Sequence, residues 1–287
     1  MLSYIFFISC KSDDSSIEDF SAPDFEQTVT GTLLNSDISE ISGIAPSYKN
    51  QGKYWVHNDS GDKPRVFLID STGYIHATIT LAKIENRDWE DIATYKDPAS
   101  GKSFVYLADI GDNFKQFDYK YIYKFEEPGI SENLENLVIS NVEKITFKYA
   151  DGKKDAETLL ADPLTGDIFI ISKWEQAVDL YHLSNINWGD TITLEKSATL
   201  AFSGATGGDI SEDGLEILIK TYNKIYYWKR TNKEPIPSVL NKPSNELAYT
   251  AEPQGEAICW TLKGKDFITV SECIPQHDCD VNFFKRK

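Results

Sequence analysis

The sequence has little of what would bind a nucleic acid or cross a membrane. Its 287 residues carry 29 Lys and Arg against 45 Asp and Glu, a formal net charge of −16. This charge repels phosphate backbones, and no basic stripe is interleaved with aromatic residues, so we expect no nucleic-acid partner. After the N-terminus, no stretch approaches the roughly 20 apolar residues that a transmembrane helix requires.

Sequence motifs of several common enzyme mechanisms are also missing. The chain has no nucleophile elbow, phosphate-binding loop, dinucleotide fingerprint or zinc-protease helix. The pair Gly207-Gly208 is too short to cradle a phosphate by itself. Covalent serine catalysis is therefore disfavoured, and whether the protein is an enzyme stays open at this point.

Cysteine is scarce, with four residues in the chain. Cys273 and Cys279 flank a turn-like loop, and we expect them to form a disulfide in an oxidising compartment. Cys259 lies in an apolar strand pattern, which predicts a buried free thiol. A zinc site that includes His277 and Asp278 is an alternative, although its spacing matches no common zinc signature.

The N-terminus is an apolar run that ends in Ser9-Cys10. It resembles the lipobox of bacterial lipoproteins, in which the cysteine is lipidated and the preceding segment, here residues 1–9, is removed. Residues 10–24 read as a flexible acidic tether, similar to the export signal of surface lipoproteins in Bacteroidetes-type bacteria. The resemblance implies an exported outer-membrane lipoprotein, surface-exposed or not, that touches the membrane only through its anchor.

Five segments of the chain align with one another, and successive copies lie 48, 67, 51 and 48 residues apart. Turn residues and further apolar runs follow each copy, giving four strands per unit, as in a β-propeller blade. The aligned segments are Glu40-Ile-Ser-Gly-Ile-Ala, Asp88-Trp-Glu-Asp-Ile-Ala, Asp155-Ala-Glu-Thr-Leu-Leu, Thr206-Gly-Gly-Asp-Ile-Ser and Gln254-Gly-Glu-Ala-Ile-Cys.

The fifth copy ends after its third strand, and the segment that starts at Gln27 can supply the missing one. We therefore predict an all-β fold, a five-bladed propeller over residues 25–287, closed by this N-terminal strand and monomeric. Two alternatives are a sixth, degenerate blade in the long spacing between the second and third copies, and two stacked sandwich domains. The second explains neither the repeat nor the complementary ends.

In a propeller, the start of each first strand lies near the axis, beside the end of the second strand. The third position of each copy is therefore predicted to face the channel mouth. Glutamates gathered there would repel one another unless a cation joined them, and Ca²⁺ accepts six to eight oxygen ligands. The alternative is that Lys173, Lys220 and Arg87 hold the glutamates without metal. The predicted metal-binding residues are Ser42, Glu90, Glu157, Gly208 and Glu256.

This pattern of one axial residue per blade weakly resembles the five-bladed calcium-activated nucleotidases (apyrases), from which Gly208 departs. A closer likeness, through His57-Asn-Asp-Ser-Gly-Asp62 and the aligned segments, is to secreted bacterial propeller proteins without an established activity. The likeness supports the fold and export, and implies little about chemistry.

Residues that close the second strands are candidates for catalysis at the mouth, since a histidine beside carboxylates can act as a base or a metal ligand. An Asx-rich turn explains the same loop equally well. The leading hypothesis is a lipid-anchored propeller whose Ca²⁺ site binds, or hydrolyses, a small anionic or glycan-derived ligand. The alternative is a non-catalytic interaction module. The candidate catalytic residues are His57, Asp59, Asp109, Lys173, Lys220 and Glu272.

Overall fold

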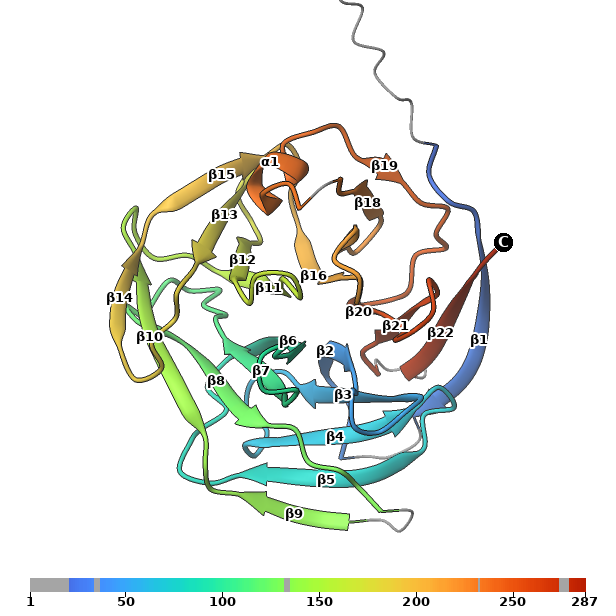
Figure 1. The fold of residues 1–287 in the computed structure, drawn as a ribbon, viewed down its shortest axis with the longest axis horizontal. Helices are drawn as coiled ribbons and strands as arrows, with labels where there is room; N and C mark the ends of the chain where they lie inside the picture. Colours follow the sequence, from blue (N-terminus) through green and yellow to red (C-terminus); the bar gives the residue numbers. More distant parts are fainter. Residues whose placement is uncertain (1–20, 34–36, 132–134, 232, 274–278) are drawn as a thin grey trace, which may run out of the picture.

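The computed structural model describes residues 21–33, 37–131, 135–231, 233–273 and 279–287. Five small sheets surround a central axis, and the first strand of each sheet lies nearest to it (Figure 1). The predicted five-bladed propeller is therefore confirmed, and the residues described form neither a sixth blade nor two stacked sandwiches. Cys10, residues 1–9 and most of the predicted tether lie outside the described residues.

The first two blades contain five strands each. Their inner four strands are antiparallel, and their outermost strand joins in parallel from a later part of the chain. Blade one consists of β2 (Ile41–Pro46), β3 (Lys53–Asn58), β4 (Arg65–Asp70), β5 (Ile75–Leu81) and β9 (Glu135–Ile139). Blade two consists of β6 (Trp89–Lys96), β7 (Ser103–Asp109), β8 (Lys120–Glu126), β10 (Glu143–Tyr149) and β14 (Thr191–Leu194).

The other three blades have four strands each, in antiparallel order. Blade three contains β11 (Ala156–Ala161), β12 (Ile168–Ser172), β13 (Val178–Leu183) and β15 (Lys196–Leu200). Blade four contains β16 (Ala205–Ile210), β17 (Glu216–Thr221), β18 (Ile225–Lys229) and β19 (Asn245–Glu246), with the short helix α1 (Ile236–Leu240) before β19. Blade five contains β20 (Gly255–Trp260), β21 (Phe267–Ser271), β22 (Cys279–Arg286) and β1 (Phe25–Leu33).

Two outer strands join a blade that the order of the chain does not indicate. The strand β14 pairs in parallel with β10 of blade two, and β15 completes blade three. The long spacing between the second and third copies contains β9, which pairs with β5 of blade one. Exposed outer strand edges accept such additions, because their backbone groups have no other partner in the sheet.

The ring closes where β1 pairs antiparallel with β22, from Phe25 opposite Arg286 to Leu33 opposite Cys279. A disulfide joins Cys273, after β21, to Cys279 at the start of β22. Since β1 and β22 are about 250 residues apart in the sequence, the last blade can form only after β22 has been made. Closure removes an exposed edge from the fifth sheet.

The core lies between neighbouring blades, and the inner strands are almost completely buried. Two aspartates also link adjacent inner strands: Asp91 accepts a hydrogen bond from the N–H of Leu159 (2.7 Å), and Asp209 accepts one from the N–H of Trp260 (2.9 Å). These bonds hold blade two to blade three and blade four to blade five.

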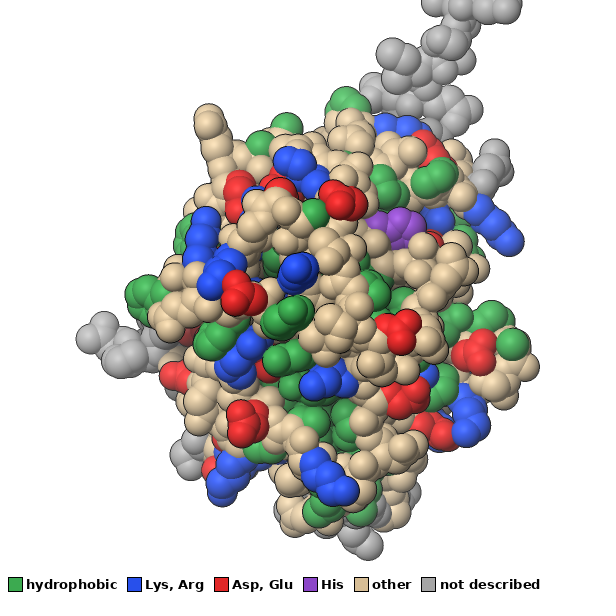
Figure 2. Space-filling view, turned by 90° about the vertical axis from the view of Figure 1, so that its left-hand side faces the viewer, with side chains coloured by type: hydrophobic (Ala, Val, Ile, Leu, Met, Phe, Trp, Pro, Cys, Tyr) green, Lys and Arg blue, Asp and Glu red, His purple; other side chains and the backbone are tan. Residues whose placement is uncertain are grey.

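The outer face over β10, β14 and β15 is mixed in charge. Figure 2 shows Lys and Arg side chains scattered among Asp and Glu side chains there, with apolar atoms between them. None of the helices in the described part of the chain is long and apolar enough to cross a membrane.

Candidate metal centre at the channel mouth

A β-bulge opens the inner strand of every blade at the same place. In each blade the pairing register between the first and second strands skips one residue, and a bulge re-aims the side chain that it adds. All five of these side chains are polar, and all five are completely or almost completely buried. The bulge residues are Ser42, Glu90, Glu157, Thr206 and Glu256.

Thr206, and not Gly208, is therefore the axial residue of blade four. The Thr206 hydroxyl donates to the carbonyl of Glu256 (3.3 Å), as the Ser42 hydroxyl donates to the carbonyl of Glu90 (2.6 Å). Gly208 faces the blade interior, where a Cβ would stand 2.8 Å from the carbonyl oxygen of Leu218. The alignment placed Asp91-Ile92 of blade two opposite Asp209-Ile210 of blade four, which put Gly208 in the axial position. The two aspartates link blades, but Asp91 lies one residue after its bulge and Asp209 three residues after its bulge.

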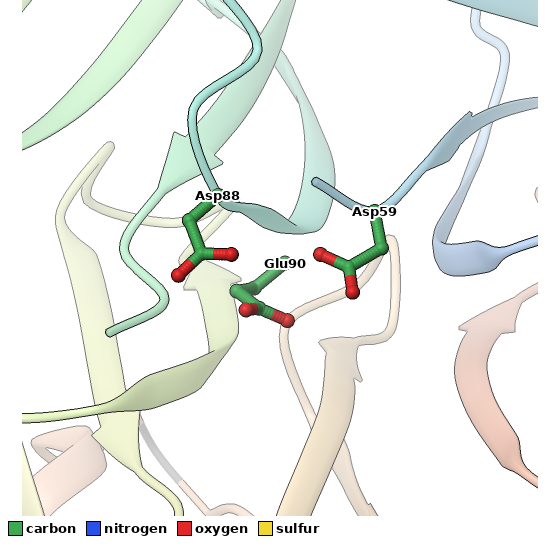
Figure 3. A group of neighbouring side chains, drawn as sticks. All are labelled: Asp59, Asp88 and Glu90. Atoms are coloured by element: carbon green, nitrogen blue, oxygen red, sulfur yellow. The ribbon is translucent and has the colours of Figure 1, made fainter. Parts of the chain in front are cut away.

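Three carboxylates converge where blades one and two meet: Asp59 after β3, Asp88 before β6, and Glu90 at the bulge of β6 (Figure 3). One oxygen atom from each lies within 4.8 Å of the others, as in a cation site. Glu90 is almost completely buried, and Asp59 and Asp88 are half-buried. This group is open toward the mouth.

A second group contains Glu90 again, together with Asp155 and Glu157, and all three carboxylates are buried. Asp155 Oδ1 accepts a hydrogen bond from the N–H of Asp112 (2.7 Å), which fixes that carboxylate. The other oxygen, Asp155 Oδ2, and Glu157 Oε2 are buried without a hydrogen-bond partner in the described structure. Buried charged oxygens without a partner are costly, so these atoms suit a bound ion.

Lys173 neutralises the opposite side of the ring. Its ammonium group forms an ion pair with Glu157 Oε1, lies 3.9 Å from Glu256 Oε1 and donates to the hydroxyl of Tyr222 (2.9 Å). Tyr222 in turn donates to Glu256 Oε1 (2.6 Å). Glu256, although predicted as a metal ligand, thus belongs to a lysine-tyrosine network and to neither carboxylate group.

The other two basic residues considered as counter-ions have different partners. Lys220 is fully buried and donates to the carbonyl of Gly255, with Glu252 3.7 Å away. Arg87 pairs with Asp109 at 2.8 Å. Of the three basic residues, only Lys173 forms an ion pair with an axial glutamate among the described residues.

The crowded carboxylates are difficult to ionise. Burial, with the neighbouring charge of Asp88 added, raises the pKa of Asp59 to about 7. Burial and then the charge of Asp155 raise the pKa of Asp88 to about 6. Burial and the charge of Glu157 raise the pKa of Glu90 well above its usual value. A divalent cation would replace these protons, because it favours the charged carboxylates.

The candidate catalytic residues do not form one site. His57 is buried within β3 beside Trp89, its Nδ1 lies 2.9 Å from the carbonyl of Asn58, and burial lowers its pKa to about 4. Asp109 and Lys220 are held by the partners given above. Asp59 and Lys173 reach the mouth. Burial, and after it the charge of Glu256, raises the pKa of Glu272 to about 8.

Two residues of the carboxylate groups were predicted neither as metal ligands nor, as Asp59 was, as candidate catalytic residues: Asp88 and Asp155. A signal for them was present, since both stand two positions before an axial glutamate, in Asp88-Trp-Glu90 and Asp155-Ala-Glu157. Side chains two residues apart on an extended chain point to the same side. The repeated Asp-x-Glu pattern could therefore have identified these two aspartates.

In a comparison with known families, residues 76–181 are similar to the CG-1 domain. The CG-1 domain is a DNA-binding domain of transcription factors. The matched residues start in β5 and end in β13, so they cover parts of the first three blades and fewer than half of the chain. No curated protein matches the chain.

This match corrects several predictions from the sequence. The assignment to secreted bacterial propeller lipoproteins is wrong, and so is the exclusion of nucleic acid as a partner. The exported, lipid-anchored module that binds or cleaves a small anionic or glycan-derived ligand is overturned with it. Those predictions depended on the total charge, on the first residues, and on the segment from His57 to Asp62 with the aligned copies, whereas the match covers residues 76–181. The choice of Ca²⁺ and the outer-membrane location stay predictions.

Proposed function

We propose that this propeller binds a divalent cation, Ca²⁺, at the mouth of its central channel. The observation that carries the proposal is the convergence of buried carboxylates from neighbouring blades, with two of their oxygens lacking any hydrogen-bond partner among the described residues. An ion there joins strands that the chain brings from separate blades, and so it stabilises the ring.

The donor set favours Ca²⁺ over the transition metals. The ligand atoms offered are carboxylate oxygens, and the two groups contain neither a histidine nor a cysteine. Hard oxygen ligands in irregular arrangements suit Ca²⁺, whereas Zn²⁺ prefers nitrogen and sulfur in a tetrahedron. Ser42 supports the site indirectly, because its hydroxyl lies 3.4 Å from Glu90 Oε2 and orients that carboxylate.

The proposal is tested by calorimetric titration of the chelator-treated protein with CaCl₂ and by melting with and without the ion. Ca²⁺ at 100 times its dissociation constant should add about 2.7 kcal/mol to the free energy of unfolding. Glu90→Gln should remove the effect, and Glu126→Gln, an exposed carboxylate paired with Lys49 and Lys102, should keep it. A folded wild-type protein that binds no Ca²⁺ and shows no melting shift would contradict the proposal.

A second candidate function, supported by the CG-1 match, is contact with DNA through residues 76–181. Lys144 and Lys148 stand four positions apart on β10, both are exposed, and they lie on one face of that strand. Because the net charge is −16, such contact would depend on local lysines and would weaken steeply with salt.

Binding to a duplex is measured by fluorescence anisotropy at 50 and 200 mM salt. Reversing both charges, Lys144→Glu with Lys148→Glu, should lower affinity roughly tenfold or more and flatten the salt dependence. Lys63→Glu with Lys285→Glu, exposed residues outside the matched segment, is the matched control. Equal loss in both double variants would mean that the matched segment has no special part in binding.

A further inference from the structure

We infer that the mouth holds two cations, with the carboxylate of Glu90 shared between them. This inference rests on the proposed function and specifies its stoichiometry. Glu90 is the member common to both carboxylate groups, and the five acidic residues do not fall into one group. The outer ion is held by Asp59, Asp88 and Glu90, and the inner ion by Glu90, Asp155 and Glu157.

The inner position is defined by oxygens that nothing else satisfies. Asp155 Oδ2 and Glu157 Oε2 are buried and unpartnered in the described structure, on residues that are each 2% exposed. Glu157 uses its other oxygen for Lys173, and Asp155 uses its other oxygen for the N–H of Asp112. Each carboxylate thus presents one free oxygen to the inner ion and is fixed through the other.

The outer position is defined by the second oxygen of Glu90. The hydroxyl of Ser42 lies 3.4 Å from Glu90 Oε2, and Glu90 is 3% exposed. Glu90 Oε1 and the carboxylate of Asp88 both lie against Gly111, and Figure 3 shows Asp59 pointing toward Glu90 from the other side. Asp59 and Asp88 are half-buried, so this ion exchanges with solvent more readily than the inner one.

Charge favours two ions over one. Five ionised carboxylates together with Lys173, which pairs with Glu157, carry −4, so one dication leaves −2 in a largely buried site and two leave no net charge. The ammonium group of Lys120 is engaged with a carboxylate outside the two groups, that of Asp112, at 3.0 Å. Unbalanced buried charge is expensive, and a second ion removes it.

The test counts bound ions by calorimetry with CaCl₂ and by mass spectrometry of the native protein. We expect two for wild type and for Glu126→Gln, one for Asp59→Asn and one for Asp155→Asn. Asn at 155 keeps an oxygen that can accept from Asp112, and Glu157→Gln replaces this variant if it does not fold. The ion that binds more tightly in wild type should be the one that Asp59→Asn retains. Glu90→Gln should weaken the binding of both ions.

The outcomes separate the two proposals. One ion in wild type, lost in both aspartate variants, would overturn the shared-glutamate pair and leave a single calcium site. No bound ion in a folded wild-type protein would overturn the pair together with the proposed function. Two ions that both persist in Asp59→Asn and in Asp155→Asn would contradict the assignment of their ligands.

Discussion

Gly111 lies directly against the carboxylate of Glu90. A Cβ at position 111 would stand 2.0 Å from Glu90 Oε1 and 2.7 Å from Asp88 Oδ2, and real carbon and oxygen atoms do not approach so closely. The absence of a side chain at this position is therefore what lets both carboxylates turn toward the same point. Glycine serves here for close approach, since a positive φ is not involved.

Gly111→Ala should lower Ca²⁺ affinity roughly 10–100-fold, the usual effect of disturbing a residue that positions metal ligands. The new methyl group must push Glu90 and Asp88 apart. Gly129→Ala is the matched control, because a Cβ there meets nothing within 4 Å. Calorimetric titration gives both affinities, and equal values for the two variants would show that Gly111 does not position the carboxylates.

Stability of the metal-free protein should fall as the pH rises from about 4 to about 8. The pKa values of Asp88, Asp59 and Glu272 are raised to about 6, about 7 and about 8, in each case mainly by burial. In this range the folded protein binds more protons than the unfolded chain, whose carboxyl groups ionise near pH 4. The stabilisation is complete below that point and is lost as each folded group ionises.

Ca²⁺ should oppose this loss, since it binds the ionised carboxylates and its affinity rises over the same pH range. Melting temperatures at pH 5, 6, 7 and 8, with chelator or with Ca²⁺, measure the difference between the two conditions. We expect the two curves to diverge toward pH 8. Parallel curves would mean that these carboxylates do not titrate with the ion.

The fold could be read from the sequence because its repeat is local. Each copy carries its own turns and apolar strands, and the run at Gln27 supplies the strand that the last copy lacks, as β1 does. Partners far along the chain were harder, because an outer edge such as that of β5 accepts any neighbouring strand, here β9. Periodicity within a strand contains no information about that choice.

The site was predictable in part, for the same reason. Alignment identified four of the five bulge residues, but the bulge of blade four is a shift in pairing, and the two Asp-Ile pairs hid it. Lys173 was considered as a counter-ion of the axial glutamates, but the hydrogen bond from Tyr222 to Glu256 was beyond the sequence, since the two residues come from different blades. Such contacts depend on how blades are rotated about the axis.

The disulfide should stabilise the closing blade. A cross-link over a loop of this length, between Cys273 and Cys279, contributes about 2 kcal/mol through the unfolded state. We expect Cys279→Ser to lower the free energy of urea unfolding by that amount, and a reductant to lower wild type to the same level. A reductant that destabilises Cys279→Ser as much as wild type would assign its effect to something other than this bond.

Lys173 should be essential to the ring when no cation is present. Its ammonium group is the partner of Glu157 and is shared with Glu256 through Tyr222, and its side chain is 5% exposed. Burial works against the charged ammonium, but the carboxylates of Glu157 and Glu256 outweigh it and raise the pKa of Lys173. Lys173→Met therefore leaves a buried carboxylate without its counter-charge, which costs about 3–5 kcal/mol.

Urea unfolding of Lys173→Met in chelator measures this loss, and added Ca²⁺ should restore part of it by binding Glu157. Lys196→Met is the matched control, since Lys196 pairs with Asp179 at 3.2 Å but is 43% exposed, and its loss should cost about 0–1 kcal/mol. If both variants lose the same small amount, Glu157 is already protonated in the metal-free protein. In that case the proton, and not Lys173, balances the inner carboxylates before the ion binds.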